Sequence, residues 1–209
     1  MPDAATADDD DLVGVGADLE PATVLHAYRN GLFPMPLGPD GPIGWWSPDP
    51  RGVLELEDLH VSRSLRRTSA RFEIRVDSAF DEVIDGCADP KRPHGWIDSR
   101  IRSAYRTLFD LGWAHSIEVF DSDGLAGGLY GLAIGGLFAG ESMFHHRTDA
   151  SKTAVMALVE LLGDGLDRLI DVQWPTPHLE TLGVTAMPRT VYLERLGELL
   201  HTPEPTLRP

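Results

Sequence analysis

Three polar residues that stand among apolar neighbours are the best candidates for chemistry in this sequence: Glu141, Asp171 and Gln173. Glu141 lies within residues 125–152, a long apolar segment with closely spaced glycines. Glycine weakens a strand, so glycines this frequent predict turns and a backbone that another group approaches closely. A half-buried strand with one solvated face would also carry a glutamate, so the pattern alone leaves both interpretations open.

The elements predicted around Glu141 are three strands and one helix. Turn signals at residues 121–124 and 135–136 divide the glycine-rich region into a β-meander. Asp149 then stands where a helix cap belongs, and apolar residues follow it at helical spacing. Glu141 is therefore expected near the end of a strand and beside the start of a helix. The expected strands are residues 114–120, 125–134 and 137–144, and the expected helix is 152–162.

A further strand is predicted at residues 168–173 (RLIDVQ). Side chains alternate along a strand, so Asp171 and Gln173 are expected on one face, with Ile170 and Val172 on the other. A carboxylate beside an amide is either the polar side of an edge strand or a pair of hydrogen-bonding groups around a reacting amine or carbonyl. In the second case the amide can position a substrate but cannot act as a base.

Length and composition describe a globular protein. The chain has 209 residues, 42% of them hydrophobic, which suffices for one large domain or two small ones. Its single cysteine, Cys87, excludes an internal disulfide and a cysteine-rich zinc site, and suits a reducing compartment. No apolar run has the length of a membrane helix, and the first residues do not have the pattern of a secretion signal. A cytoplasmic protein that does not bind a membrane is therefore expected.

Charge is distributed unevenly along the chain. The net charge is −15, and residues 1–20 contain seven acidic residues and no Lys or Arg. Such a segment is typical of disorder, so residues 1–11 are expected to form a disordered acidic tail. Against this acidic background, residues 60–75 concentrate basic side chains, which form either a solvated helix face or a surface for phosphates. The basic positions of interest are Arg63, Arg66, Arg67 and Arg71.

The order of predicted elements indicates an α+β protein with two parts. Helices are expected at residues 21–30, from residue 78 and at 99–111, with a strand at 72–76. A proline-rich stretch ends near residue 50 and contains Trp45 and Trp46, which could pack in a core or stack on a ring. These boundaries predict a small N-terminal domain at 12–49 and a larger domain at 50–209. Strands and helices alternate without a repeat, which argues against a doubly wound parallel sheet.

Eight motifs occur in order along the chain: YRNGLFPMP, WWSPDPRG, GWI, AHSIEVF, GGLYG, GLFAGESMF, ASK and LIDVQ. In this order and spacing they resemble the leucyl/phenylalanyl-tRNA protein transferases, bacterial enzymes that move Leu or Phe from tRNA onto proteins beginning with Arg or Lys. The resemblance covers about residues 12–196. It implies a C-terminal catalytic domain with the acyl-CoA N-acyltransferase fold (the GCN5-related N-acetyltransferase fold), and acceptor proteins marked for degradation by the N-degron pathway.

The resemblance also implies roles for individual residues. Asp171 and Gln173 match a proposed catalytic pair that orients the attacking amine, and Glu141 matches an essential glutamate of the pocket. Trp96 matches a tryptophan that holds the terminal adenosine, whereas Met35 stands where the family has a second tryptophan. The aminoacyl pocket would be formed by Leu129, Phe138, Met143, Leu158, Leu162 and Ile170, of which Leu158 and Leu162 replace aromatic residues. The contacts to the acceptor stem would come from Arg63, Arg66, Arg67 and Arg71.

Peptide-bond formation from an aminoacyl ester needs neither a metal nor a cofactor, so none is expected, and the protein is expected to be a monomer. Three alternatives remain open. A CoA-dependent N-acetyltransferase would share the fold, but the sequence has no glycine-rich loop of the type that binds pyrophosphate. A module that only binds tRNA or basic N-termini would keep Trp96 and the arginines. A metallohydrolase based on His145 and His146 is disfavoured, because adjacent strand residues point to opposite faces.

Overall fold

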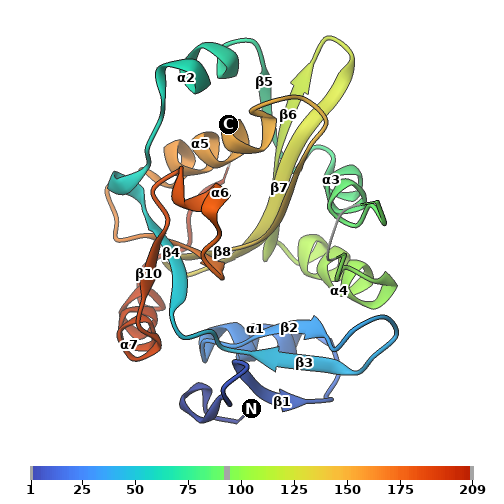
Figure 1. The fold of residues 1–209 in the computed structure, drawn as a ribbon, viewed down its shortest axis with the longest axis vertical. Coiled ribbons are helices and arrows are strands. Elements are labelled where there is room, and N and C mark those ends of the chain that lie inside the picture. The colour runs from blue at the N-terminus through green and yellow to red at the C-terminus, as the bar shows by residue number, and fades with distance from the viewer. Residues whose placement is uncertain (1, 92–94, 208–209) are drawn as a thin grey trace.

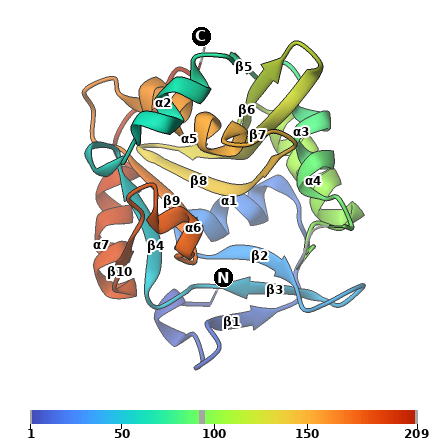
Figure 2. The same ribbon diagram turned by 45° about the horizontal axis from the view of Figure 1, so that its top comes forward.

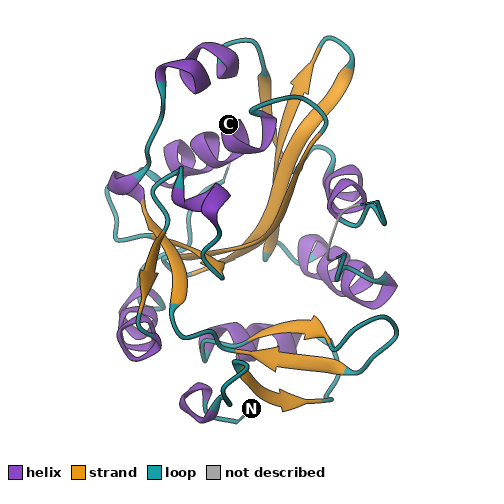
Figure 3. Cartoon of the chain, in the orientation of Figure 1, coloured by secondary structure: helices purple, strands orange, loops and turns teal. Residues whose placement is uncertain are grey.

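The computed structural model describes residues 2–91 and 95–207, which form two β-sheets with helices packed around them (Figures 1 and 3). The smaller sheet lies near the N-terminus and is antiparallel throughout, with strand order β1-β3-β2. One helix, α1, connects its first two strands along the chain. The bounds of these elements are β1 (Leu12–Val15), α1 (Pro21–Arg29), β2 (Phe33–Pro36) and β3 (Ile43–Trp46).

The larger sheet has seven strands in the order β10-β4-β9-β8-β7-β6-β5. Strands β8 and β9 run parallel, and the other neighbouring strands of this sheet run antiparallel. A parallel pair needs a crossover connection, which α5 provides between β8 and β9. The strands are β4 (Arg51–Glu55), β5 (Glu73–Val76), β6 (Ala114–Asp121), β7 (Gly124–Ile134), β8 (Leu137–His145), β9 (Leu169–Gln173) and β10 (Thr185–Met187).

Helices cover both faces of the larger sheet, and each face has its own group of buried residues. On one face, α2 and α5 pack over Leu129, Phe138 and Ile170. On the other, α1, α3, α4 and α7 contribute to a cluster with Tyr130 and Leu132. Figure 2 shows α2 and α5 on one side of β8 and α1 on the other. The helices are α2 (Arg63–Ser69), α3 (Phe80–Cys87), α4 (Ser99–Asp110), α5 (Ala150–Leu162), α6 (Pro177–Glu180) and α7 (Arg189–Leu199), with short 3-10 turns η1 (Ala4–Thr6) and η2 (Leu56–Asp58).

The predicted β-meander and the helix after it are confirmed. Strands β6, β7 and β8 follow one another with turns at residues 122–123 and 135–136, where Gly135 adopts a φ of 60° that glycine tolerates. Helix α5 begins after Asp149, whose backbone oxygen accepts hydrogen bonds from the amide (2.8 Å) and hydroxyl (2.9 Å) of Thr153. The α+β prediction is also confirmed, and Glu141 lies on β8, nine residues before Ala150, the first residue of α5.

The acidic start differs from the disordered tail that its composition predicts. Residues 4–6 form η1, and Ala4 is buried in the same core as α1. Asp11 accepts three hydrogen bonds through its side chain, from Asp49, Trp174 and Arg189. The segment is more ordered than its composition predicts, because hydrogen-bond donors from distant parts of the chain contact this carboxylate. The local sequence gives no indication of such distant partners.

Candidate active site

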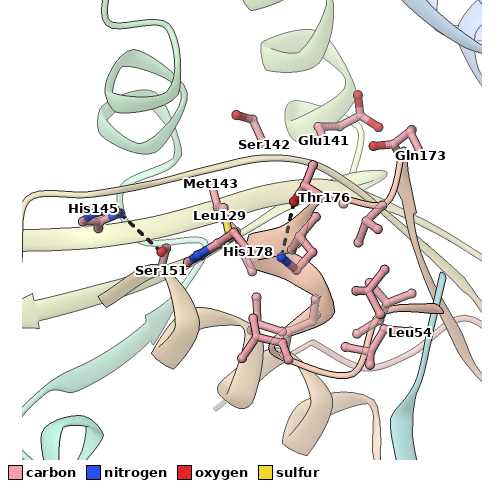
Figure 4. Close-up of a pocket in the computed structure, with 18 residues that line it drawn as sticks. Leu54, Leu129, Glu141, Ser142, Met143, His145, Ser151, Gln173, Thr176 and His178 are labelled. Atoms are coloured by element: carbon pink, nitrogen blue, oxygen red, sulfur yellow. Dashed lines mark hydrogen bonds between the residues drawn. The ribbon is translucent and has the colours of Figure 1, made fainter. Parts of the chain in front are cut away.

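Two adjoining cavities lie beside β8, β9 and α6; the larger extends to α5, and the smaller extends to β2 of the N-terminal sheet. The larger has a volume of 420 Å³ and is shown in Figure 4; the smaller has a volume of 180 Å³. Pockets for small ligands are usually apolar with a few convergent polar groups, and this pair fits that description. Three polar side chains, those of Glu141, Gln173 and Thr176, stand at the junction. The lining residues that both cavities share are Glu141, Val172, Gln173, Thr176 and Leu179.

The larger cavity is lined mainly by apolar side chains. Of the residues expected to line an aminoacyl pocket, the structure brings four together there: Leu129, Met143, Leu158 and Ile170. The other two, Phe138 and Leu162, are buried in the core cluster on that face and do not line the cavity. They stand behind the walls, in the same buried cluster as Leu129, Leu158 and Ile170.

The smaller cavity has aromatic walls. Trp96 and Met35, the two residues predicted at an adenosine site, both line it, and Phe33 and Trp174 line it with them. The ring of Trp174 packs edge-on against Phe33, with centroids 5.0 Å apart and an interplanar angle of 88°. Trp174 therefore belongs to the site, although it is not among the residues predicted from the sequence.

The two adjacent tryptophans of the N-terminal sheet serve packing. Trp45 is 2% exposed, and its indole nitrogen donates to the backbone oxygen of Gly16 at 2.7 Å. The indole nitrogen of Trp46 donates to the backbone oxygen of Met35 at 3.1 Å. Of the two alternatives that the sequence left open, the structure favours core packing for Trp45 and support of the cavity wall for Trp46.

Glu141 accepts hydrogen bonds from two buried tyrosines. The hydroxyl of Tyr28 lies 2.6 Å from its Oε1 and the hydroxyl of Tyr105 lies 2.8 Å from its Oε2. Burial raises the pKa of Glu141 to about 7, although both hydrogen bonds favour the charged form and act in the opposite direction. Burial and the adjacent carboxylate likewise raise the pKa of each tyrosine well above 10, so both remain protonated donors.

The hydrogen bonds of this trio need more protons than the two tyrosines supply. The two hydroxyl oxygens lie 2.5 Å apart, so three close contacts join Glu141, Tyr28 and Tyr105. With Glu141 ionised, two hydroxyl protons serve three contacts; with Glu141 protonated, a closed ring of three donors and three acceptors forms. A carboxyl group with a pKa of about 7 therefore changes between these two arrangements near neutrality.

Asp171 lies behind the cavities in a buried ion pair. Arg51 donates to both of its oxygens, from Nε to Oδ1 at 2.8 Å and from Nη2 to Oδ2 at 2.7 Å, and both side chains are almost fully buried. Tyr192 and the backbone amide of Gln173 donate to the same carboxylate at 2.8 and 2.9 Å. These four bonds use the acceptor capacity of Asp171, so it holds structure around the site. Burial opposes the charge of Arg51, but Asp171 outweighs it and raises the pKa of the guanidinium.

Gln173 does not share a face with Asp171, and this corrects the alternation expected for the strand. Its φ is 62°, in the left-handed region, so the regular alternation ends at this residue. Its side chain lines both cavities together with Val172, which was expected on the opposite face. With its amide nitrogen oriented toward β8, Gln173 donates to the backbone oxygens of Gly140 (2.9 Å) and Val172 (3.2 Å). The amide is therefore fixed at the junction of the cavities.

The four basic residues expected to bind RNA lie on or just after α2, on the face of the sheet that α5 covers. Arg63, Arg66, Arg67 and Arg71 are exposed, and no carboxylate among residues 2–91 and 95–207 pairs with them. Arginines elsewhere are mostly neutralised: Arg106, for example, pairs with Asp81 and Asp110. The arginines of α2 thus keep a local positive field on an acidic protein.

The structure offers no support for the metallohydrolase alternative. Within the described parts of the chain, no three His, Cys, Asp or Glu residues come together as a set that could hold a metal ion. The ring of His146 packs against Phe144, with centroids 5.1 Å apart, whereas Nδ1 of His145 lies 3.5 Å from the hydroxyl of Ser151. The two histidines therefore have separate environments.

None of the helices in the described residues is both long and apolar enough to cross a membrane.

The fold and the site together define an α+β protein that can hold an apolar side chain and a flat ring on either side of Glu141 and Gln173. Comparison with known families gives the particular family. Residues 53–197 match the leucyl/phenylalanyl-tRNA protein transferase family, and residues 17–49 match the N-terminal domain of the same family. The chain belongs to the leucyl/phenylalanyl-tRNA protein transferase family.

Individual relatives agree over nearly the whole length. The chain is 48% identical over 202 residues to the leucyl/phenylalanyl-tRNA–protein transferase of Tolumonas auensis, covering 95% of this chain and 86% of the relative. It is 49% identical over 213 residues to the protein of that name from an Anaeromyxobacter species, covering 100% of this chain and 89% of the relative. Among solved structures, the L-PGS of Bacillus licheniformis shows a weak similarity, with a TM-score of 0.41, 10% identity, and coverage of 73% of this chain and 65% of that chain.

Four residues of the site escaped the sequence analysis: Tyr28, Arg51, Tyr105 and Trp174. Tyr28 and Arg51 belong to the motifs YRNGLFPMP and WWSPDPRG, which gave neither residue a role of its own. A signal was available for Trp174, because it directly follows Gln173 and a tryptophan beside a candidate catalytic residue is a natural wall for a ring.

Proposed function

We propose that this chain is an aminoacyltransferase that moves Leu or Phe from aminoacyl-tRNA to the N-terminal amine of an acceptor protein, with Met as a third candidate for transfer. The observation that carries the proposal is the junction of an apolar cavity and an aromatic cavity at Glu141 and Gln173. An aminoacyl-tRNA presents an apolar side chain and a nucleoside on either side of one ester group, and the two cavities match these parts. The family of the chain supports the same reaction.

The reaction needs positioning more than activation, because the ester is already reactive. The neutral α-amine of the acceptor attacks the ester carbonyl carbon, a C–N bond forms, and the ester C–O bond breaks. The tRNA leaves with its terminal hydroxyl, which takes up the proton that the amine loses. In this scheme the larger cavity holds the transferred side chain, the smaller holds the terminal nucleoside, and the carbonyl lies beside Gln173.

Each polar residue then has a distinct role. Gln173 accepts a hydrogen bond from the attacking amine through its amide oxygen and so orients the amine, since an amide cannot take the proton itself. Asp171 is a positioning residue: it holds the backbone amide of Gln173 and is itself held by Arg51. Glu141 in its charged form holds the α-ammonium group of the aminoacyl moiety, which fixes the side chain in the larger cavity.

The arginines of α2 contact the acceptor stem of the tRNA in this proposal. Leu65 of α2 is buried in the same cluster as Leu158 and Ile170, so the helix stands on the face of the sheet that holds the larger cavity. Exposed arginines without a carboxylate partner attract phosphates, and the attraction weakens with salt. This accounts for RNA binding by a chain with a net charge of −15.

The proposed function also includes the nature of the acceptor, the fold of the catalytic part, and the location and oligomeric state of the protein. The acceptor begins with Arg or Lys, because an acidic protein favours a cationic first residue, and the product enters the N-degron pathway. The catalytic part, residues 50–209, has the acyl-CoA N-acyltransferase fold; a mixed sheet with a parallel β8–β9 pair and an α5 crossover supports this assignment. The protein works as a cytoplasmic monomer.

One assay tests the proposed function. Purified protein is mixed with tRNA charged with labelled Leu, Phe or Met and with a peptide that begins with Arg, and the label on the peptide is measured. Transfer of Leu or Phe is expected, with none to the same peptide acetylated at its N-terminus. Transfer from acetyl-CoA to the free peptide, without transfer from charged tRNA, would favour the acetyltransferase alternative. Binding of charged tRNA without any transfer would favour a non-catalytic module.

A further inference from the structure

Trp174 forms one wall of the smaller cavity, and its ring is held from three directions. Its centroid lies 5.0 Å from that of Phe33 and 6.1 Å from that of Trp46, edge-on in both cases. Its indole nitrogen donates to Oδ2 of Asp11 at 3.1 Å. The ring is only partly buried, and with Trp96 it gives the cavity two indole side chains. A ring held in this way offers a surface of fixed orientation to whatever enters the cavity.

Asp11 connects this ring to two other parts of the chain. Its Oδ1 accepts from the backbone amide of Asp49 at 3.0 Å and from Nη2 of Arg189, the first residue of α7, at 3.3 Å. Its backbone oxygen accepts from the amide of Ser47 at 2.9 Å. The N-terminal segment is thereby tied to the end of β3, the start of α7 and the residue that follows Gln173.

The backbone conformation of Asp11 indicates that these contacts outweigh the usual preference of a non-glycine residue for a negative φ. Its φ is 69°, in the left-handed region that non-glycine residues seldom adopt, although aspartate tolerates it better than most. Residues held in such a conformation persist where their surroundings determine them, and they cluster at ligand sites. A glycine would adopt this backbone without strain but would leave the indole nitrogen of Trp174 without its acceptor.

We propose that Trp174, positioned by Asp11, is a base-stacking wall of the smaller cavity and packs against the nucleobase at the aminoacylated end of the tRNA. The inference rests on the proposed function and adds a binding residue and a positioning residue to it. A volume of 180 Å³ suits one flat ring system rather than a whole nucleotide. Because Trp174 directly follows Gln173, stacking on this ring also sets how far the ester carbonyl lies from the amide that orients the amine.

The test measures binding of a phenylalanyl-adenosine in which an amide replaces the ester, a probe that contains the base and the side chain but no phosphate. Trp174→Leu keeps an apolar wall and removes the π face. The dissociation constant of the probe should then rise about tenfold or more, because stacking on an aromatic ring strengthens binding of a base substantially. Trp174→Phe keeps a ring but loses the N–H, so its affinity should fall between those of the wild type and Trp174→Leu. Circular dichroism and thermal unfolding check that each variant is folded.

A second comparison isolates the positioning role of Asp11. Asp11→Gly should weaken binding of the probe about threefold to tenfold in the wild-type background. It should have little effect in a protein that already carries Trp174→Phe, because the hydrogen bond from the indole nitrogen to Asp11 is then already absent. Asp9→Gly is the matched control: Asp9 is exposed, lies in the same acidic segment, and its loss changes the net charge equally. Equal effects of Asp11→Gly and Asp9→Gly would show that Asp11 acts only through charge.

Two outcomes overturn the inference, and they differ from failure of the proposed function. If the wild type binds the probe and transfers Phe while folded Trp174→Leu binds within twofold of it, Trp174 is not a stacking wall. If Trp174→Leu does not fold, Trp174→Phe provides the test. The inference is overturned if Trp174→Phe binds the probe as tightly as the wild type and if Asp11→Gly weakens binding in the Trp174→Phe protein as much as it does in the wild type. If the wild type neither binds the probe nor transfers Phe, the proposed function itself fails.

Discussion

The replacement Glu141→Gln should change how the stability of the protein depends on pH. The side chain keeps its size and can still hydrogen-bond to Tyr28 and Tyr105, but it no longer titrates. In the wild type, burial raises the pKa of Glu141 from 4.5 to about 7. The folded protein therefore binds this proton more tightly than the unfolded chain, so the stability it contributes is complete below pH 4.5 and is lost as the pH rises through 7.

The size of the effect follows from the two pKa values. A difference between 4.5 and about 7 corresponds to about 3 kcal/mol of unfolding free energy over the full titration. About 2 kcal/mol of this is expected to disappear between pH 5.5 and pH 8, a range that stays above the isoelectric point of 4.8. Other ionisable groups titrate in both proteins, so they cancel when the variant is subtracted from the wild type.

Urea unfolding of both proteins at several pH values between 5.5 and 8 measures this difference. Tyr28→Phe is a second variant, in which Glu141 still titrates. It removes a hydrogen bond that favours the charged form of Glu141, so the pKa of Glu141 should rise further. The loss of stability should therefore move to higher pH. A difference between wild type and Glu141→Gln that stays constant across this range would refute the proton-sharing trio as described.

Three other perturbations separate chemistry from structure. Gln173→Gly should reduce kcat about a hundredfold without lowering Tm, because glycine accepts the φ of 62° and only the amide is lost; near-normal turnover would remove Gln173 from the mechanism. Asp171→Asn leaves a buried guanidinium without its countercharge and should cost about 3–5 kcal/mol in urea unfolding, whereas a cost under about 1 kcal/mol would mean that the pair is hydrated. Replacing Arg66 and Arg67 by Ala should reduce the salt dependence of tRNA binding by about one or two released ions. Arg106→Ala is the control, because Arg106 is already paired with a carboxylate. An equal reduction in Arg106→Ala would argue against a specific contact surface on α2.

The local elements of the site could be predicted from sequence because their signals are local. Turn residues, glycines and apolar periodicity predicted the meander of β6, β7 and β8 and the helix α5 within a few residues, and so placed Glu141 near α5. The basic character of α2 was equally visible, because charge is read directly from composition. Which apolar residues line a cavity and which stand behind it depends on packing, and Phe138 and Leu162 do not line the larger cavity.

The partners of the buried carboxylates could not be predicted, because they lie far away in the sequence. Tyr28 is 113 residues from Glu141, and Arg51 is 120 residues from Asp171. Nothing in a strand or helix pattern says which distant donor will meet a given acceptor, although burial of a carboxylate requires that some donor does. The roles of the two acidic residues differ for this reason: Glu141 keeps one side toward the cavities, whereas Arg51 and Tyr192 enclose Asp171.

The alternation rule fails at Gln173, the residue that the proposed reaction needs at the junction of the cavities. A regular strand would have turned Gln173 toward Asp171 and away from the cavities, which would leave the junction without an amide. A φ of 62° at Gln173 ends the strand, turns the side chain into both cavities and leaves its backbone amide bonded to Asp171. The ion pair between Arg51 and Asp171 holds the carboxylate to which the backbone amide of Gln173 donates, so it fixes the strand where this conformation begins. Departures from local rules are expected at functional sites because the rest of the fold compensates for them. The buried ion pair and the strained glutamine are therefore two parts of one arrangement, and weakening the first should loosen the second before the protein unfolds.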